Sequence, residues 1–164
     1  MTVSLVPGQP ITMSIVSTPA HLPVVRAALG ELARLIGFDE RGADGLVLAV
    51  DEALANVIEH AYEGRSDGPI TVSFTALLEI DRQVGIEVVL EDRGQSVDKR
   101  LIHGRDLDDI RPGGLGTHIM IACMDQLEYA HRDGGGTRLR MLKYLPLPAE
   151  AAGATITGES RGST

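Results

Sequence analysis

The chain has 164 residues, 43% of them hydrophobic, which fits one domain able to bury roughly 70% of its unfolded surface. Its formal net charge is −8, from 15 Lys and Arg against 23 Asp and Glu, so a nucleic-acid backbone would be repelled at long range. An aromatic content of 3% without any Trp also removes the usual platforms for stacking bases. Direct binding of nucleic acid is therefore not expected.

No segment of the sequence predicts secretion or membrane insertion. Residues 1–8 lack the basic and apolar regions of a signal peptide, and apolar runs such as residues 46–50 are far shorter than the roughly 18 to 20 residues that span a bilayer. The single cysteine, Cys123, excludes an internal disulfide, and we expect it to be a buried, inert thiol in an apolar helix. The expected location is the cytoplasm, with no membrane partner.

The first predicted element is a strand at residues 11–16, whose alternating apolar side chains indicate one buried face. Two helices are expected next. Thr18 is the candidate cap of the first helix, which ends at Gly37, and the second begins near Asp39 and ends at Gly64. Apolar residues recur in both at helical spacing: Leu22, Val25, Leu29, Leu32 and Ile36, then Leu46, Val50, Ala53, Val57 and Ala61.

Residues 70–78 and 84–90 both alternate apolar and polar side chains, which predicts an antiparallel pair of strands. The stretch 93–113 has no convincing period, and a loop of that length is typical of a lid or a binding segment. The remaining predicted elements are a helix over residues 114–124 and two hairpin strands over residues 126–131 and 136–144.

One face of the predicted strands is apolar and the other is polar, which indicates a sheet covered by helices on one side only. We therefore predict an α/β fold of the two-layer α+β sandwich type, with a mixed, mostly antiparallel sheet. Residues 1–145 would form the domain, and residues 146–164, rich in small and polar residues, would form a flexible tail. The polar face carries Thr71, Ser73, Thr75, Glu87, Arg138 and Arg140.

The second helix carries the first of four candidate functional segments. Glu52, Asn56 and His60 follow at intervals of four residues, which would place them within an arc of about 80° on one helix face. A carboxylate can accept a proton, and an amide oxygen is a hard ligand suited to Mg²⁺. An ordinary solvated helix face is the alternative interpretation of this spacing.

The other three segments follow strands or precede a helix. Asp92 could accept a hydrogen bond from an amino group, and Gly94 would allow close approach of a backbone or ligand. Thr137 supplies a hydroxyl after three glycines. The third segment stands at a helix start, whose free amides suit phosphate: Gly113, Gly114, Leu115, Gly116 and Thr117. Taken singly, each segment could equally be a turn or a plain helix start.

In their joint order, these four segments resemble the GHKL ATP-binding superfamily of gyrase-type ATPases and histidine kinases. Within it, the chain is most similar to the bacterial anti-sigma factor serine kinases. The resemblance covers about residues 11–144 and implies a Bergerat-type fold that binds ATP with Mg²⁺. The family commonly has a second Gly or Ala two residues after Gly94, where this chain has Ser96.

The resemblance also implies a role for each site residue. Glu52 would be the general base, Asn56 would hold Mg²⁺ and Asp92 would receive the adenine amino group. Gly94 would let the base approach, and Thr137 would lie near the adenine. His60 stands where the family often has a histidine, although a capping or core-edge histidine is an equal alternative. The phosphates would be wrapped at the glycine-rich segment by Gly113, Gly114, Leu115, Gly116 and Thr117, beneath a mobile lid over residues 93–113.

The function that the resemblance implies is partner switching. Such kinases phosphorylate an anti-anti-sigma protein of the STAS type on Ser or Thr, sequester a sigma factor and are often homodimers. The polar sheet face or the first helix could form the dimer contact. The first alternative is a catalytically silent, ATP-gated binding module, against which Glu52 argues because a pure binder needs no base. The second, the catalytic half of a histidine kinase, would require a phospho-acceptor domain for which there is no room before residue 11.

Overall fold

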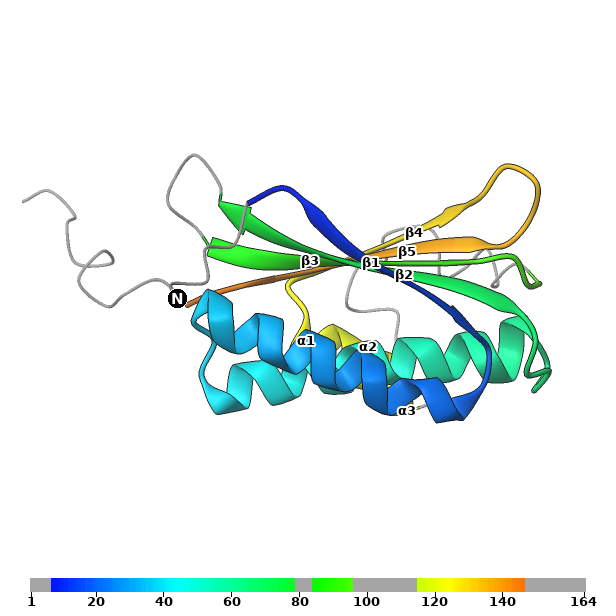
Figure 1. Ribbon diagram of the computed structural model, residues 1–164, viewed down its shortest axis with the longest axis horizontal. Helices are drawn as coiled ribbons and strands as arrows, with labels where there is room; N and C mark the ends of the chain where they lie inside the picture. The colour runs from blue at the N-terminus through cyan, green and yellow to red at the C-terminus, as the bar shows by residue number, and fades with distance from the viewer. Residues whose placement is uncertain (1–6, 79–83, 96–114, 147–164) are drawn as a thin grey trace, which may run out of the picture.

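A five-stranded sheet and three α-helices make up the part of the chain that the computed structural model describes, residues 7–78, 84–95 and 115–146 (Figure 1). Neighbouring strands are antiparallel in every pairing, so the sheet expected to be mixed is antiparallel throughout these strands. Their order in the sheet is β1 (Pro10–Val16), β2 (Pro69–Leu78), β3 (Val84–Asp92), β5 (Thr137–Tyr144) and β4 (Gln126–His131). The alternation of apolar residues predicted β1, β2 and β3, and the turn chemistry of a hairpin supported the prediction of β4 and β5.

The helices lie together on one face of the sheet, which confirms the predicted two-layer sandwich (Figure 1). They are α1 (Leu22–Ile36), α2 (Glu40–Asn56) and α3 (Leu115–Cys123), with a short 3₁₀ turn η1 (Pro19–His21) before α1 and a π-helical turn η2 (Val57–Ala61) after α2. The Asp39 carboxylate accepts a hydrogen bond of 2.7 Å from the Gly42 amide and so caps α2, which begins near Asp39 as predicted.

The start of α1 corrects the sequence prediction. Thr18 makes no capping hydrogen bond with its side chain, and the residues after it form the 3₁₀ turn η1. Pro23 accounts for this, because it has no amide hydrogen to bond the carbonyl of Pro19 four residues earlier. That carbonyl accepts from the Leu22 amide instead, and the α-helix begins only there. The predicted end is confirmed, since Gly37 adopts a left-handed conformation with φ 110°.

The core lies between the helices and the inner face of the sheet. Phe74 from β2 is 1% exposed and Leu29 from α1 is fully buried, and burying each side chain stabilises the fold by roughly 1.5–3 kcal/mol. At the edge strand β1 the predicted buried face is incomplete, because Met13 and Ile15 pack against the core whereas Ile11 is 49% exposed. The inner face of the three central strands contributes Ile70, Val72, Ile86, Val88, Leu90, Leu139 and Met141.

Two further predictions concern the C-terminal tail and the cysteine. Leu145 packs against the core and its amide bonds the Val84 carbonyl at 2.8 Å, whereas the tail expected after it lies outside the described residues from position 147 onward. Cys123 ends α3 and is half-buried rather than buried.

The outer face of the sheet carries the polar residues that the sequence placed there. Arg140 contacts Glu87 on β3 and Glu128 on β4, so one guanidinium bridges three strands. Thr12 and Ser73 hydroxyls pair across β1 and β2 at 3.0 Å. Such exposed pairs each add roughly 0.2–1 kcal/mol, so they set the strand register more than they stabilise the fold.

Candidate active site

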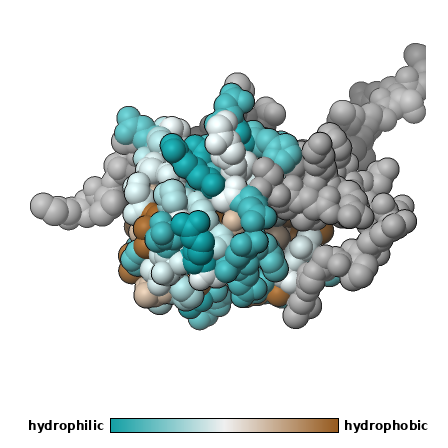
Figure 2. Space-filling model, turned by 90° about the vertical axis from the view of Figure 1, so that its right-hand side faces the viewer, coloured by the Kyte–Doolittle hydropathy of each residue, from teal (hydrophilic) through white to brown (hydrophobic). Residues whose placement is uncertain are grey.

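One end of the molecule gathers the chain segments that the sequence singled out. The end of α2 with η2, the end of β3 and the turn between β4 and β5 all lie at the right-hand end of Figure 1. Figure 2 looks onto this end, and most of the described surface there is hydrophilic. The sheet register explains why the last two of these segments are adjacent. β3 pairs with β5 so that Glu91 lies opposite Arg138, and Asp92, at the end of β3, is therefore next to Thr137, at the start of β5.

Asp92 is the buried carboxylate of this site. It is 2% exposed, and its Oδ1 accepts hydrogen bonds from the Gly94 amide at 2.8 Å and, less closely, from the Thr137 amide at 3.4 Å. Burial raises the pKa of the Asp92 carboxyl, although the two amides and the nearby Arg132 oppose this shift. The structure therefore brings Asp92, Gly94 and Thr137 together, as the sequence predicted.

Thr137 has a buried hydroxyl that the described part of the chain leaves without a hydrogen bond. The residue is 3% exposed, and its Oγ1 has no partner. A buried polar group left in this way costs roughly 1–3 kcal/mol, which a ligand that reached it with a donor or acceptor would recover. The hydroxyl beside Asp92 is thus a fitting contact for a polar ring such as a nucleotide base.

Two glycines allow backbone segments to meet around Asp92. A Cβ on Gly136, which has φ 91°, would collide with the Asp92 carbonyl oxygen and lie 2.7 Å from the Arg93 Cα. A Cβ on Gly94 would collide with the Ala61 carbonyl oxygen, and the next amide, Gln95, bonds that oxygen at 2.8 Å. The close approach expected at Gly94 is therefore made by the end of η2.

Glu52 and Asn56 lie half-buried on α2, one helical turn apart. Glu52 points toward the first turn of α3, because a Cβ on Gly116 would collide with its Oε2. Thr117 follows in the same turn and is half-buried. The candidate base is thus beside the N-terminal end of the helix predicted to receive phosphate, where unpaired amides favour an anion.

His60 lies beyond the α-helix that carries Glu52 and Asn56. The α-helix ends at Asn56, and in η2 the Tyr62 amide bonds the Val57 carbonyl at 3.0 Å, five residues back. A π-helical turn rotates less per residue than an α-helix, so the 100° spacing of the prediction does not apply across it, although four residues still make roughly one turn. His60 is exposed.

Part of the predicted site lies outside the described residues. Gly113, Gly114 and the predicted lid from Ser96 onward fall there, and of Leu115 only the backbone is described, as the first residue of α3. Among the described residues, no group of three or more His, Cys, Asp or Glu side chains is placed to hold a metal ion. Asn56 remains the residue that the sequence assigns to Mg²⁺.

Arg132 was missed in the sequence. Its Nη1 donates to the Asp92 carbonyl oxygen at 2.7 Å, and its guanidinium lies 3.6 Å from Glu91. No sequence signal indicated a role for Arg132, because a single arginine in a hairpin belongs to no recognisable motif. It reaches Asp92 only because β3 pairs with β5. It holds the backbone of Asp92 from the side of the hairpin.

The comparisons with known proteins agree with this geometry. Residues 15–143 match the histidine kinase-like ATPase domain. The chain is 32% identical to the serine-protein kinase RsbW of Listeria monocytogenes over 143 residues, covering 82% of this chain and 87% of that protein. It is 31% identical to the RsbW of Bacillus velezensis, covering 89% and 92%.

A solved structure adds a three-dimensional match. The RsbU and RsbW domains of Rv1364c from Mycobacterium tuberculosis superpose with a TM-score of 0.56 at 26% identity, over 85% of this chain but only 34% of that longer one. The chain belongs to the histidine kinase-like ATPase domain family. Within that family its relatives are the RsbW serine-protein kinases, which confirms the resemblance seen in the sequence. No helix in the described ranges is long and apolar enough to cross a membrane.

Proposed function

We propose that this protein is an ATP-dependent serine/threonine kinase that acts as an anti-sigma factor. It phosphorylates a STAS-type anti-anti-sigma protein and sequesters a sigma factor, working in the cytoplasm as a homodimer. The observation that carries the proposal is the buried pair of Asp92 and Thr137, whose hydroxyl has no partner among the described residues. The pair lies where β3 ends and β5 begins, at the end of the fold where α2 also ends, and Glu52 and Asn56 belong to the last turns of α2 (Figure 1). The names of the RsbW relatives support the kinase activity.

Asp92 and Thr137 would hold the adenine of ATP. The amides of Gly94 and Thr137 both bind Oδ1 of the carboxylate, so Oδ2 would be the oxygen that accepts from the adenine amino group. The Thr137 hydroxyl would complete its hydrogen bonding on the same ring. Guanine has an oxygen where adenine has its amino group at C6, so it would place an acceptor against the buried carboxylate and leave both unpaired; the site would therefore select ATP over GTP.

Glu52 and Asn56 would serve the other end of the nucleotide. Mg²⁺, bound through the Asn56 amide oxygen and the phosphates, would neutralise charge on the triphosphate. The phosphates would lie at the first turn of α3, where the amides of Gly116 and Thr117 are available to an anion. Glu52, against Gly116, would accept the proton of the incoming serine or threonine hydroxyl.

The test is Glu52→Gln, assayed by transfer of radiolabelled phosphate from ATP to a STAS-type protein. Loss of the base should lower the rate of transfer by about 10²- to 10⁴-fold while ATP affinity stays within about twofold. Glu40→Gln is the matched control, because it makes the same chemical change in the first turn of α2, at the far end of that helix.

Two results would contradict the proposal. Phosphate transfer by Glu52→Gln at the wild-type rate would show that Glu52 is not the general base. A wild-type protein that forms an ATP-dependent complex without making phosphoserine or phosphothreonine would be a nucleotide-gated binding module, not a kinase.

A further inference from the structure

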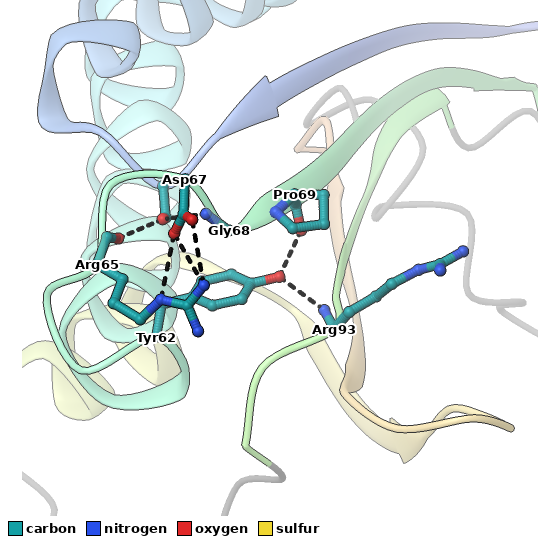
Figure 3. Close-up of polar contacts among 7 residues, drawn as sticks. Tyr62, Arg65, Asp67, Gly68, Pro69 and Arg93 are labelled. Atoms are coloured by element: carbon teal, nitrogen blue, oxygen red, sulfur yellow. Dashed lines mark hydrogen bonds and ion pairs between the residues drawn. The ribbon is translucent and has the colours of Figure 1, made fainter.

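The hydroxyl of Tyr62 joins three segments of the candidate site (Figure 3). Tyr62 follows η2 directly and is 7% exposed. Its hydroxyl donates to the Pro69 carbonyl oxygen at 2.6 Å and accepts from the Arg93 amide at 2.8 Å. One oxygen thus connects the end of the helix with the start of β2 and with the residue that follows Asp92.

This hydroxyl stands where the ladder between β2 and β3 stops. Ile70 pairs with Asp92, so the next step of the register would place Pro69 opposite Arg93. Proline has no amide hydrogen, and this pair cannot exchange the two hydrogen bonds of a regular antiparallel rung. Tyr62 satisfies the carbonyl of one residue and the amide of the other, so the strand end is held by a side chain.

The position of the ring is itself fixed. A Cβ on Gly68 would overlap the Tyr62 ring, so only glycine leaves room for it. Gly68 is held in turn by Ser17, which is fully buried: the Gly68 amide bonds the Ser17 hydroxyl at 2.9 Å, and the Ser17 amide bonds the Gly68 carbonyl at 2.8 Å. The Ser17 hydroxyl also donates to the Arg65 carbonyl oxygen. The phenol is therefore seated on a rigid turn.

We propose that Tyr62 is a positioning residue for recognition of the nucleotide base. By holding the Arg93 amide, it fixes the backbone between Asp92, which would bind the adenine amino group, and Gly94, whose amide orients that carboxylate. The inference rests on the proposed function of Asp92. Burial raises the pKa of the Tyr62 phenol, so at neutral pH the hydroxyl keeps the proton that it donates to Pro69.

The test compares two nucleotides on Tyr62→Phe, which keeps the ring and removes the hydroxyl. With Mg²⁺ present, we expect affinity for ATP to fall about three- to tenfold, the range of one hydrogen bond. Affinity for purine riboside triphosphate, which lacks the amino group, should change less than twofold. The preference for ATP over this analogue is a readout that a purely structural role would leave unchanged.

Tyr129→Phe is the matched control, since Tyr129 lies partly buried on β4 and outside the site. It should bind both nucleotides as the wild type does. If Tyr62→Phe keeps the wild-type preference, or loses affinity for both nucleotides equally, the positioning role is refuted while the proposed function stands. If the wild type itself binds no ATP, the proposed function fails and this inference fails with it.

A measurement on the wild type covers the case in which Tyr62→Phe does not fold. Hydrogen exchange followed by nuclear magnetic resonance should show the Arg93 amide protected in the absence of nucleotide, because its acceptor is a buried phenol rather than water. Exchange of this amide as fast as that of an exposed loop would show that the contact is absent in solution and would overturn the proposal.

Discussion

Asp92 combines a buried negative charge with few hydrogen bonds to stabilise it. Two backbone amides reach its Oδ1, one of them at 3.4 Å, and burial raises its pKa. A carboxylate held in this way destabilises the empty protein, because its charged form is better solvated in the unfolded chain. Such a loss of stability is common at groups that bind a ligand rather than stabilise the fold.

Asp92→Asn should therefore stabilise the nucleotide-free protein at pH 7. The amide keeps an oxygen to accept from Gly94 and Thr137 and removes the buried charge. Thermal unfolding followed by circular dichroism should give a higher Tm for the variant than for the wild type.

The same experiment has a defined pH dependence. Since the pKa of Asp92 is raised in the folded protein, the folded state binds more protons than the unfolded state above about pH 4, and the wild type loses stability as pH rises through the folded pKa. The Tm difference between variant and wild type should narrow as pH is lowered toward about 4. A difference that widens in acid, or a variant less stable at pH 7, would contradict this account.

At this scale the sequence predicted the residues whose chemistry is local. Asp92 and Thr137 stand at the ends of strands whose pattern was clear, so each could be singled out, but only the resemblance to a family indicated that they meet. Tyr62 and Arg132 were missed, because their roles depend on backbone atoms brought to them by strand pairing. No spacing along the chain encodes such a contact.

Among the elements, the hairpin between β4 and β5 connects packing most directly with the site. Gly134, Gly135 and Gly136 all adopt positive φ, and the Arg132 amide bonds the Gly136 carbonyl at 3.2 Å. Only the last glycine touches the end of β3, where its Cα hydrogen faces the Asp92 carbonyl. In this turn, Gly136 is therefore needed for the close approach to Asp92, whereas the other two glycines are needed only for the backbone conformation of the turn.

Gly136→Ala and Gly134→Ala separate these two effects. The positions have φ 91° and 89°, but a Cβ at 134 meets nothing within 4 Å, whereas one at 136 collides with Asp92. Gly134→Ala should lower the free energy of unfolding in urea by about 1–2 kcal/mol from backbone strain alone. Gly136→Ala should lower the free energy of unfolding by about 1–3 kcal/mol more than Gly134→Ala does, because the strands must shift to make room for the Cβ. Equal losses would show that the contact with Asp92 does not matter.

Elements with a regular period were predicted well and irregular turns were not. The alternation in residues 70–78 and the apolar stripe from Leu46 to Ala61 were sufficient for β2 and α2. The 3₁₀ turn η1 and the π-helical turn η2 were read as α-helix, since hydrophobic spacing does not distinguish hydrogen bonds three, four or five residues apart over one turn.

In the whole molecule, the order of strands brings residues far apart in sequence to one end. Asp92 and Thr137 are 45 positions apart, and the antiparallel register of β3 with β5 brings them side by side. On the inner face, α2 ends at Asn56, one turn after Glu52, and η2 follows it at this end of the molecule (Figure 1). Periodicity does not specify the order of strands in a sheet. The sequence therefore predicted that these segments form one site only through their resemblance to a family.

The most direct test of the account is isothermal titration of ATP and Mg²⁺ into the wild type, Asn56→Ala and Asp92→Asn. The two residues are 36 positions apart and belong to different layers of the fold. If they bind opposite ends of one nucleotide, each substitution should weaken ATP binding by at least about tenfold, the effect of losing one charged or metal-directed contact. Wild-type affinity in both variants would show that no nucleotide site joins the helix to the end of β3.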